Sequence, residues 1–385
     1  MNLDTILHPV RPERFDPPGG FAPGQWGALV DMHFREGLFP ADLQHKLCLI
    51  GITEEGSRRN PADSIRRYLY QLRGDDYAGR FCDLGDYTFD PGKGNDYRTL
   101  SVVLSEVRKQ GGLPLLLGRS ARYTYAQYLA HEYREEYVNL VQVAPQLSLD
   151  LTKSTPPEDF DYLASILLRE PNYLFNFSQI GYQSYFMDPR HLELLEQLYF
   201  EGLRLGDIRA DLKLAEPIMR QCNLLSIDMS ATRYADYQAG QFHSPNGFAG
   251  EEICALGRYA GLNGTLYSAG IYNYYPERDE SGQNAHLIAH AVWYLVEGLT
   301  FNHHEHPHEN REQFTRYIAR FDKGEDHIIF YKSPMSGRWW VEVPIDPQHA
   351  DYQQHQLVPC TYEDYLQAVH HEIPDRYWKA MMKLA

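Results

Sequence analysis

Short apolar runs alternate with amphipathic segments along most of the chain. Residues 46–52 form an apolar run that ends in Gly and acidic residues, which is typical of a buried parallel strand. The next segment, 63–72, places Ile65, Tyr68 and Leu72 at helical spacing. Strand and helix patterns keep alternating to residue 298, so the pattern predicts an α/β domain with three layers and a doubly wound parallel sheet.

The other elements of this domain are predicted from the same two periodicities. Strands are expected over 81–84, 173–178 and 265–272, and at the start of three longer stretches, 112–125, 139–151 and 224–231. Helices are expected over 97–110, 125–133, 160–169, 192–201, a segment ending at 260, and 284–298.

The two ends of the chain have different patterns. Residues 1–44 are rich in Pro and Gly, with a short helix expected over 26–35, and are interpreted as a lead-in that packs on a main domain spanning 45–300. In the C-terminal extension, 301–385, residues 327–332 and 338–343 alternate in polarity around a turn that contains Pro334 and Gly337, which predicts a hairpin. Segments 362–371 and 374–384 are then expected to form two closing helices.

Composition narrows the class of partner. A chain of 385 residues with 43% hydrophobic content can bury a large core. Its formal charge of -16 disfavours nucleic acid and acidic membranes, so a small-molecule ligand or a protein partner is expected. The chain has no apolar run long enough to cross a membrane and no secretory leader pattern, which predicts a cytoplasmic protein. Five scattered cysteines without a Cys-x-x-Cys pair indicate neither a disulfide framework nor a zinc site.

Three stretches combine a strand with a polar turn: 112–125, 139–151 and 224–231. The small and polar residues follow the strand's carboxyl end, where open parallel sheets hold their ligands. These three loops are therefore expected to meet in one site.

Together they resemble the metal-binding motifs of the ureohydrolase family, which includes arginase, agmatinase and formimidoylglutamase. In that family the motifs are Gly-Gly-x-His-Ser/Asp, Asp-x-His-x-Asp and Ser-x-Asp-x-Asp, and they supply six ligands to two manganese ions. The resemblance covers roughly residues 45–300. It implies a sheet of arginase type and assembly into a homo-oligomer.

Most of the ligands are replaced in this sequence. The resemblance puts the six ligand positions at Ala121, Ala144, Gln146, Ser148, Asp228 and Ser230, of which only Asp228 keeps its metal-binding residue type. Each carboxylate beside a partly buried cation contributes about 4 kcal/mol of attraction at an effective dielectric near 20. The loss of three carboxylates therefore removes much of the metal affinity, and no cofactor is expected; manganese is the alternative.

Arginines have entered the first and third motifs. Arg119 and Arg122 are candidates for anion contacts or for salt bridges, as is Arg233. One hypothesis is that a guanidinium of Arg122 or Arg233 pairs with Asp228 and so takes the place of the metal charge.

Glu252 is a second candidate carboxylate. The segment 244–252 resembles a family segment whose final Glu contacts the guanidinium-like end of the substrate. The alternative, slightly favoured, is that Glu252 is a first-turn acid that stabilises the amino terminus of its helix.

Two further groups carry weaker signals. The loop His303–His308 holds four histidines and is a candidate for a relocated metal site, although an exposed loop is favoured because the ligand spacing is not fixed. Ser226 and Ser230 near His243 lack the nucleophile elbow that a serine hydrolase needs.

Two functions of different classes remain. The first is a pseudoenzyme that binds a ligand or a protein partner through the former pocket and the C-terminal extension. The second is an active hydrolase of amidine or guanidine C–N bonds, of the formimidoylglutamase or arginase kind, that uses a rebuilt site with Asp228 and Glu252. A purely structural oligomer is a third reading, in which pocket substitutions have no effect. Metal binding separates the first two, because a manganese-bound hydroxide is the usual nucleophile of such hydrolases.

Overall fold

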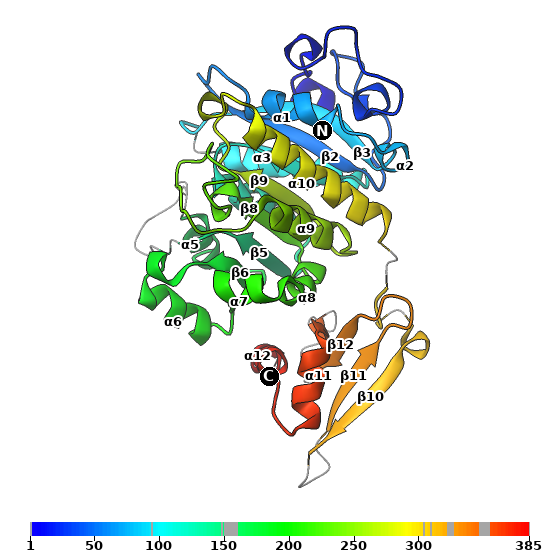
Figure 1. Cartoon of the computed structure of the whole chain (residues 1–385), viewed down its shortest axis with the longest axis vertical. Coiled ribbons are helices and arrows are strands. Elements are labelled where there is room, and N and C mark those ends of the chain that lie inside the picture. Colours follow the sequence, from blue (N-terminus) through cyan, green and yellow to red (C-terminus); the bar gives the residue numbers. More distant parts are fainter. Residues whose placement is uncertain are drawn as a thin grey trace.

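A nine-stranded parallel sheet forms the main body of the computed structural model (Figure 1), with the strand order β1-β3-β2-β4-β9-β8-β5-β6-β7. The structure describes residues 2–93, 95–147, 149, 161–302, 305–308, 310–321, 327–345 and 355–384. The strands are β1 Asp31–Met32, β2 Leu47–Glu54, β3 Phe81–Phe89, β4 Leu113–Leu117, β5 Val138–Val143, β6 Leu174–Tyr182, β7 Glu201–Arg204, β8 Leu224–Asp228 and β9 Ser268–Tyr272.

Helices cover both faces of this sheet and complete three layers (Figure 1). Those that pack on one face are α1 Pro61–Leu69, α2 Asp75–Ala78, α7 Leu205–Ala210, α8 Ala215–Arg220, α9 Gly250–Gly261 and α10 Gln283–Thr300. Those on the other face are α3 Asp96–Lys109, α4 Thr124–Glu132, α5 Tyr162–Leu167 and α6 Pro189–Gln197. The predicted doubly wound α/β fold is confirmed.

The sheet is buried on both faces because its strands are apolar at successive positions. In β2, Leu47 and Leu49 enter the core on the α1 and α10 side, whereas Cys48 and Ile50 enter the core on the α3 and α4 side. Burying a Leu or Ile side chain fully contributes roughly 1.5–3 kcal/mol. Continuous apolar runs such as 47–50 are therefore what a central parallel strand requires.

The lead-in differs from the prediction. Residues 26–35 do not form a helix: a 3-10 turn spans Trp26–Ala28, and β1 then pairs in parallel with β3. Trp26 is fully buried, and its indole stacks at a tilt on Phe81 with 5.1 Å between ring centroids. The lead-in thus supplies an edge strand to the main sheet, and the aromatic contact fixes the strand there.

The C-terminal extension holds a second sheet, antiparallel and four-stranded, where the sequence predicted only a hairpin. The predicted hairpin corresponds to β11 His327–Lys332 and β12 Trp339–Glu342. It is flanked by β10 Thr315–Arg320 and β13 Leu357–Cys360, and α11 Tyr362–Val369 and α12 Asp375–Leu384 follow. The extension joins the main body at α8, where Arg220 Nη2 donates to the Trp339 carbonyl over 3.0 Å.

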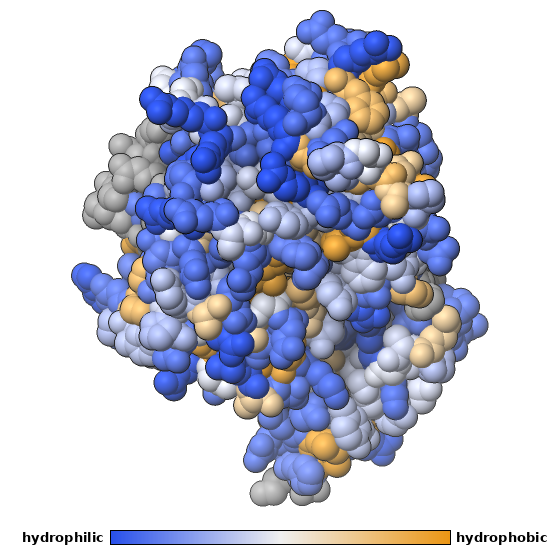
Figure 2. Space-filling model, turned by 45° about the horizontal axis from the view of Figure 1, so that its top comes forward, coloured by the Kyte–Doolittle hydropathy of each residue, from blue (hydrophilic) through white to orange (hydrophobic). Residues whose placement is uncertain are grey.

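The surface face in Figure 2 is mostly hydrophilic, with apolar residues in small separate patches. Among the described residues, no helix combines the length and the hydropathy needed to cross a membrane.

Candidate functional site

The first motif loop follows β4 and enters a 3-10 turn, Ala121–Tyr123. The Ser120 side chain accepts from the Arg122 backbone N–H over 3.2 Å, which caps this turn. Ala121, at the predicted histidine position, is 7% exposed and offers only a methyl group. The Ser120 side chain therefore caps the turn that holds the first motif position.

Both arginines of this loop form ion pairs with glutamate carboxylates. Arg122 Nη2 lies 2.6 Å from Glu54 Oε1, and the Tyr123 hydroxyl donates to the same oxygen over 2.7 Å. Arg119 Nη2 donates to Glu277 Oε2 over 2.9 Å. Burial and the Glu54 carboxylate raise the Tyr123 pKa well above its ordinary value, so this phenol stays protonated.

At the second motif, the backbone carbonyls of two former ligand positions accept hydrogen bonds from glutamine side chains. Ala144 is 4% exposed, and its carbonyl accepts from Gln179 Nε2 over 2.7 Å. Gln146 is half-buried, and its carbonyl accepts from Gln142 Nε2 over 3.4 Å. The Tyr162 hydroxyl donates to Gln142 Oε1. Ser148, the third position of this motif, lies outside the described residues.

The third motif ends β8 with a buried carboxylate. Asp228 Oδ1 accepts three hydrogen bonds: 2.8 Å from the Ser230 backbone N–H, 2.6 Å from the Ser230 hydroxyl and 2.8 Å from Asn273 Nδ2. The first of these caps the 3-10 turn Met229–Ala231. Burial is the main cause that raises the Tyr162 pKa, and the nearby Asp228 charge adds to it.

The hypothesis that an arginine replaces the metal charge at Asp228 is not supported by these contacts. Arg122 pairs with Glu54, and Arg233 Nε lies 3.1 Å from Asp236 Oδ2. Ser230 and Asn273 donate hydrogen bonds to Asp228 Oδ1, and these neutral donors stabilise its carboxylate.

These residues do not fit a pair of manganese ions. The side chains of Ala121 and Ala144 have no ligand atom, the Ala144 carbonyl already accepts from Gln179, and Asp228 Oδ1 already accepts three donors. Mn²⁺ favours carboxylate, carbonyl and water oxygens. No group of three or more His, Cys, Asp or Glu side chains that would suit a metal occurs in the part of the chain that the structure describes.

Glu252 occupies the amino terminus of α9, where it caps the helix. Its Oε2 accepts from the Ala249 backbone N–H over 2.6 Å, and its Oε1 lies 3.5 Å from Arg209 Nε. Both carboxylate oxygens thus have protein partners. This geometry favours the interpretation of Glu252 as a helix-capping acid over that of a substrate contact.

The structure describes two histidines of the histidine-rich loop, His306 and the exposed His308. His306 is half-buried and packs against Trp340 with 6.1 Å between ring centroids. Burial and the neighbouring His308 lower the His306 pKa to about 4. His303 and His304 lie outside the described residues.

The weak serine–histidine signal does not form a catalytic pair. Ser226 accepts from the Thr124 hydroxyl over 2.9 Å, and His243 packs edge-on against Tyr234 with 5.5 Å between centroids. Neither contact orients a base toward a nucleophile.

Sequence reasoning missed two residues of this site, Asn273 and Glu54. Asn273 directly follows β9, which lies beside β8 with Asp228 opposite Tyr272. Glu54 ends β2. Both stand at the carboxyl ends of apolar runs, the same signal that marked the three motif loops. That signal indicates their positions, whereas their partners depend on the strand order of the sheet.

Comparison with known proteins identifies similar folds but no sequence relative. No protein-family model and no curated protein matches the sequence. Formiminoglutamase from Trypanosoma cruzi, solved with Mn²⁺, has a TM-score of 0.60 at 14% identity, over 72% of this chain and 99% of that one.

Two more solved structures give similar values. Formimidoylglutamase from Bacillus subtilis has a TM-score of 0.59 at 14% identity, over 69% of this chain and 89% of its own. Agmatine ureohydrolase from Thermoplasma volcanium has a TM-score of 0.55 at 19% identity, over 72% and 94%. Likeness at these identities establishes the arrangement of strands and helices.

Proposed function

We propose that this chain, which has the ureohydrolase fold, acts without a binuclear manganese site, as a pseudoenzyme that binds a small-molecule ligand or a protein partner. The observation that carries the proposal is the set of hydrogen bonds that Asp228 accepts from protein groups. It is the one metal-ligand type kept among the motif positions, and its Oδ1 is engaged by Ser230 and Asn273.

The surroundings of Asp228 support the same conclusion. A hydrolase of this fold must turn water into a nucleophile near neutral pH, and bulk water has a pKa near ~15.7. The nearby Tyr162 phenol is held protonated by burial, and Gln142 and Gln146 are neutral amides. None of these groups is a general base for water at neutral pH.

The arginines of the first loop favour a closed site. Arg122 and Arg119 each form an ion pair with a carboxylate, so they connect the first loop to Glu54 and Glu277. An anion would have to displace Glu54 or Glu277 to reach them. We therefore assign these two arginines to loop stability and not to ligand binding.

Hydrolysis assays test this proposal. The full chain is incubated with formimidoylglutamate, arginine or agmatine, with and without added Mn²⁺, and formamide or urea release is followed. The expected result is no release above the level of an Asp228→Asn variant, which preserves the side-chain shape. Manganese-dependent turnover that disappears in Asp228→Asn would establish the alternative, an active hydrolase with a rebuilt site.

A further inference from the structure

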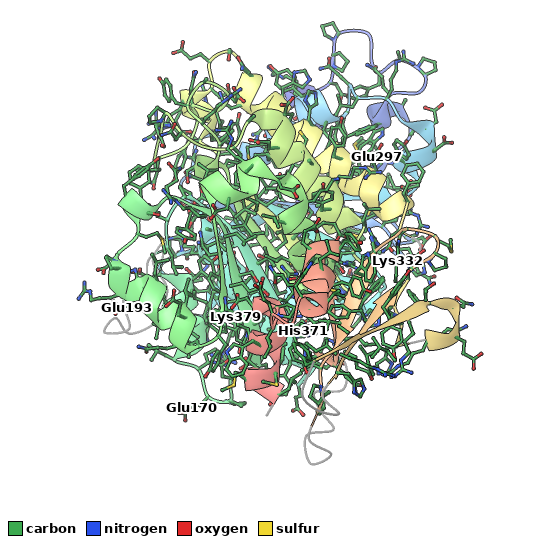
Figure 3. The ribbon with its side chains drawn as sticks, turned by 60° about the horizontal axis from the view of Figure 1, so that its bottom comes forward. Glu170, Glu193, Glu297, Lys332, His371 and Lys379 are labelled. Atoms are coloured by element: carbon green, nitrogen blue, oxygen red, sulfur yellow. The ribbon has the colours of Figure 1, made fainter. Side chains whose placement is uncertain are left out.

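A cavity of about 120 Å³ lies between the main domain and the C-terminal extension. It borders the amino-terminal ends of β5, β6, β7 and β8, and α12 and β13 close its other side. In Figure 3, Lys379 lies where α12 faces the strands of the main sheet. The second and third motif loops follow the opposite, carboxyl ends of β5 and β8. A strand of six residues, such as β5, separates the two regions by about 20 Å.

Arg220 at the end of α8 brings unsatisfied donors to this cavity. Its side chain is 7% exposed, and its Nη2 lies 3.2 Å from Glu216 Oε2 and 3.0 Å from the Trp339 carbonyl oxygen. Its Nε and Nη1 are buried without a hydrogen-bond partner. A buried N–H group without an acceptor costs free energy, so this guanidinium favours an acceptor that the protein does not provide.

Three cations of α12 line the same cavity: Arg376, Lys379 and Lys383. Their spacing of three, four and seven residues puts them on one helix face. Arg376 Nη2 lies 3.6 Å from Glu201 Oε2, and Lys379 Nζ lies 2.8 Å from Asp375 Oδ2.

Lys383 differs from the other two, because its ammonium donates to the neutral amide oxygen of Asn176. The ammonium also lies 5.1 Å from the centroid of the Phe200 ring. Burial lowers its pKa to about 7. The described cavity wall holds four arginine and lysine side chains and a single carboxylate, that of Glu201.

Asn139 adds a complementary acceptor. Its Nδ2 donates to the Gln221 carbonyl over 2.9 Å, which fixes the orientation of the amide. Its Oδ1 is buried without a donor. A ligand that carries both negative oxygens and an O–H group, such as hydrogen phosphate, would satisfy the donors of Arg220 and the acceptor of Asn139 together.

We propose that this cavity is a binding site for a small oxyanion of the phosphate or carboxylate class. The chain carries a net charge of -16, so a buried cluster of basic side chains gives this cavity an electrostatic potential opposite in sign to the net charge. Charged donors around an oxyanion form short, strong hydrogen bonds, and an arginine can bind it with two N–H groups. This proposal goes beyond the function proposed above, because the two sites share no residue.

Isothermal titration calorimetry on the full chain tests the proposal. Inorganic phosphate is titrated in a chloride buffer of constant ionic strength, and acetate is titrated in parallel to distinguish phosphate from carboxylate. We expect saturable binding of at least one anion at one site per chain. Lys383→Met should weaken that binding by roughly 10-fold to 100-fold, since it removes a charge-assisted contact and keeps the side-chain length.

Lys332→Met is the matched control. Lys332 belongs to β11 of the same extension, lies over the Trp339 ring at 5.4 Å, and is not part of the cavity wall. Its removal should leave anion affinity unchanged. Equal weakening of anion binding by both variants would indicate a general charge effect and would overturn the proposal. The proposal would also be overturned if Lys383→Met and the wild type bound the anion with equal affinity.

A second measurement does not depend on any variant. The thermal midpoint of the wild-type chain should rise with phosphate or acetate concentration as binding at one site predicts. It should not rise with chloride at equal ionic strength. Absence of saturable heat and of a midpoint shift for both anions would overturn the proposal. Either result leaves the metal and hydrolysis assays of the motif region unaffected.

Discussion

Asp228 and Asn273, at the ends of two neighbouring strands, are joined by a hydrogen bond of 2.8 Å from Asn273 Nδ2 to Asp228 Oδ1. Asn273 has a φ of 66°, a left-handed conformation that Asn tolerates better than most residues. Its Oδ1 accepts from the Gln241 backbone N–H over 2.9 Å. The pair thus links β8, β9 and the segment around residue 241, which gives the retained carboxylate a structural role.

Asp228→Ala should therefore destabilise the protein. The substitution leaves the buried donors of Ser230 and Asn273 without their acceptor, and we expect a loss of roughly 1–3 kcal/mol in the free energy of unfolding. Urea denaturation followed by circular dichroism measures it. An unchanged or higher stability would contradict the structural role, since removal of a strained active-site carboxylate commonly stabilises an enzyme.

Glu252→Ala should cost about 0.5–2 kcal/mol of stability, the typical loss for a helix cap. Glu252→Gln keeps an oxygen that can accept from the Ala249 N–H and should cost less. The exposed neighbour Glu251 provides the control, as Glu251→Ala should change stability by under about 0.5 kcal/mol. Equal losses at positions 251 and 252 would argue against the cap.

The Arg122–Glu54 pair should show measurable coupling. A double-mutant cycle with Arg122→Met and Glu54→Gln is expected to give about 1–2 kcal/mol, because both side chains are more than two-thirds buried and Tyr123 shares the same oxygen. The Arg119–Glu277 pair, whose carboxylate is 47% exposed, should give under about 1 kcal/mol. Equal coupling in the two cycles would contradict the assignment of the buried Arg122–Glu54 pair to loop stability.

Stability without an added oxyanion should rise with pH above neutrality. Burial lowers the Lys383 pKa to about 7, whereas an unfolded lysine titrates near ~10.4. Between these values the unfolded chain binds the extra proton, so the free energy of unfolding increases with pH by up to about 1.4 kcal/mol per unit.

Lys383→Met should flatten this rise, measured by urea denaturation at a series of pH values. The charged groups around Lys383, namely Glu201, Lys379 and Arg376, remain in the variant and so provide the internal control. A slope that is the same in wild type and variant would assign the pH effect to another group.

The sequence was informative wherever burial alone dictated structure. Central strands such as β4 and β8 are continuous apolar runs, and these runs located the strands and the polar loops that follow them. Edge strands lack this signal: β7 is half exposed in alternation, and β13 contains Pro359, which a strand at the edge of its sheet tolerates. Partners such as Asn273 depended on strand order, which places β9 between β4 and β8 and cannot be read from one strand's own pattern.

The most direct test of the central claim is the metal content of the untagged protein, measured by inductively coupled plasma mass spectrometry before and after incubation with manganese. We expect far less than one manganese per chain, with no difference between wild type and Asp228→Ala. Two manganese ions per chain that are lost in Asp228→Ala would instead mean that ligands outside the six motif positions complete a working site.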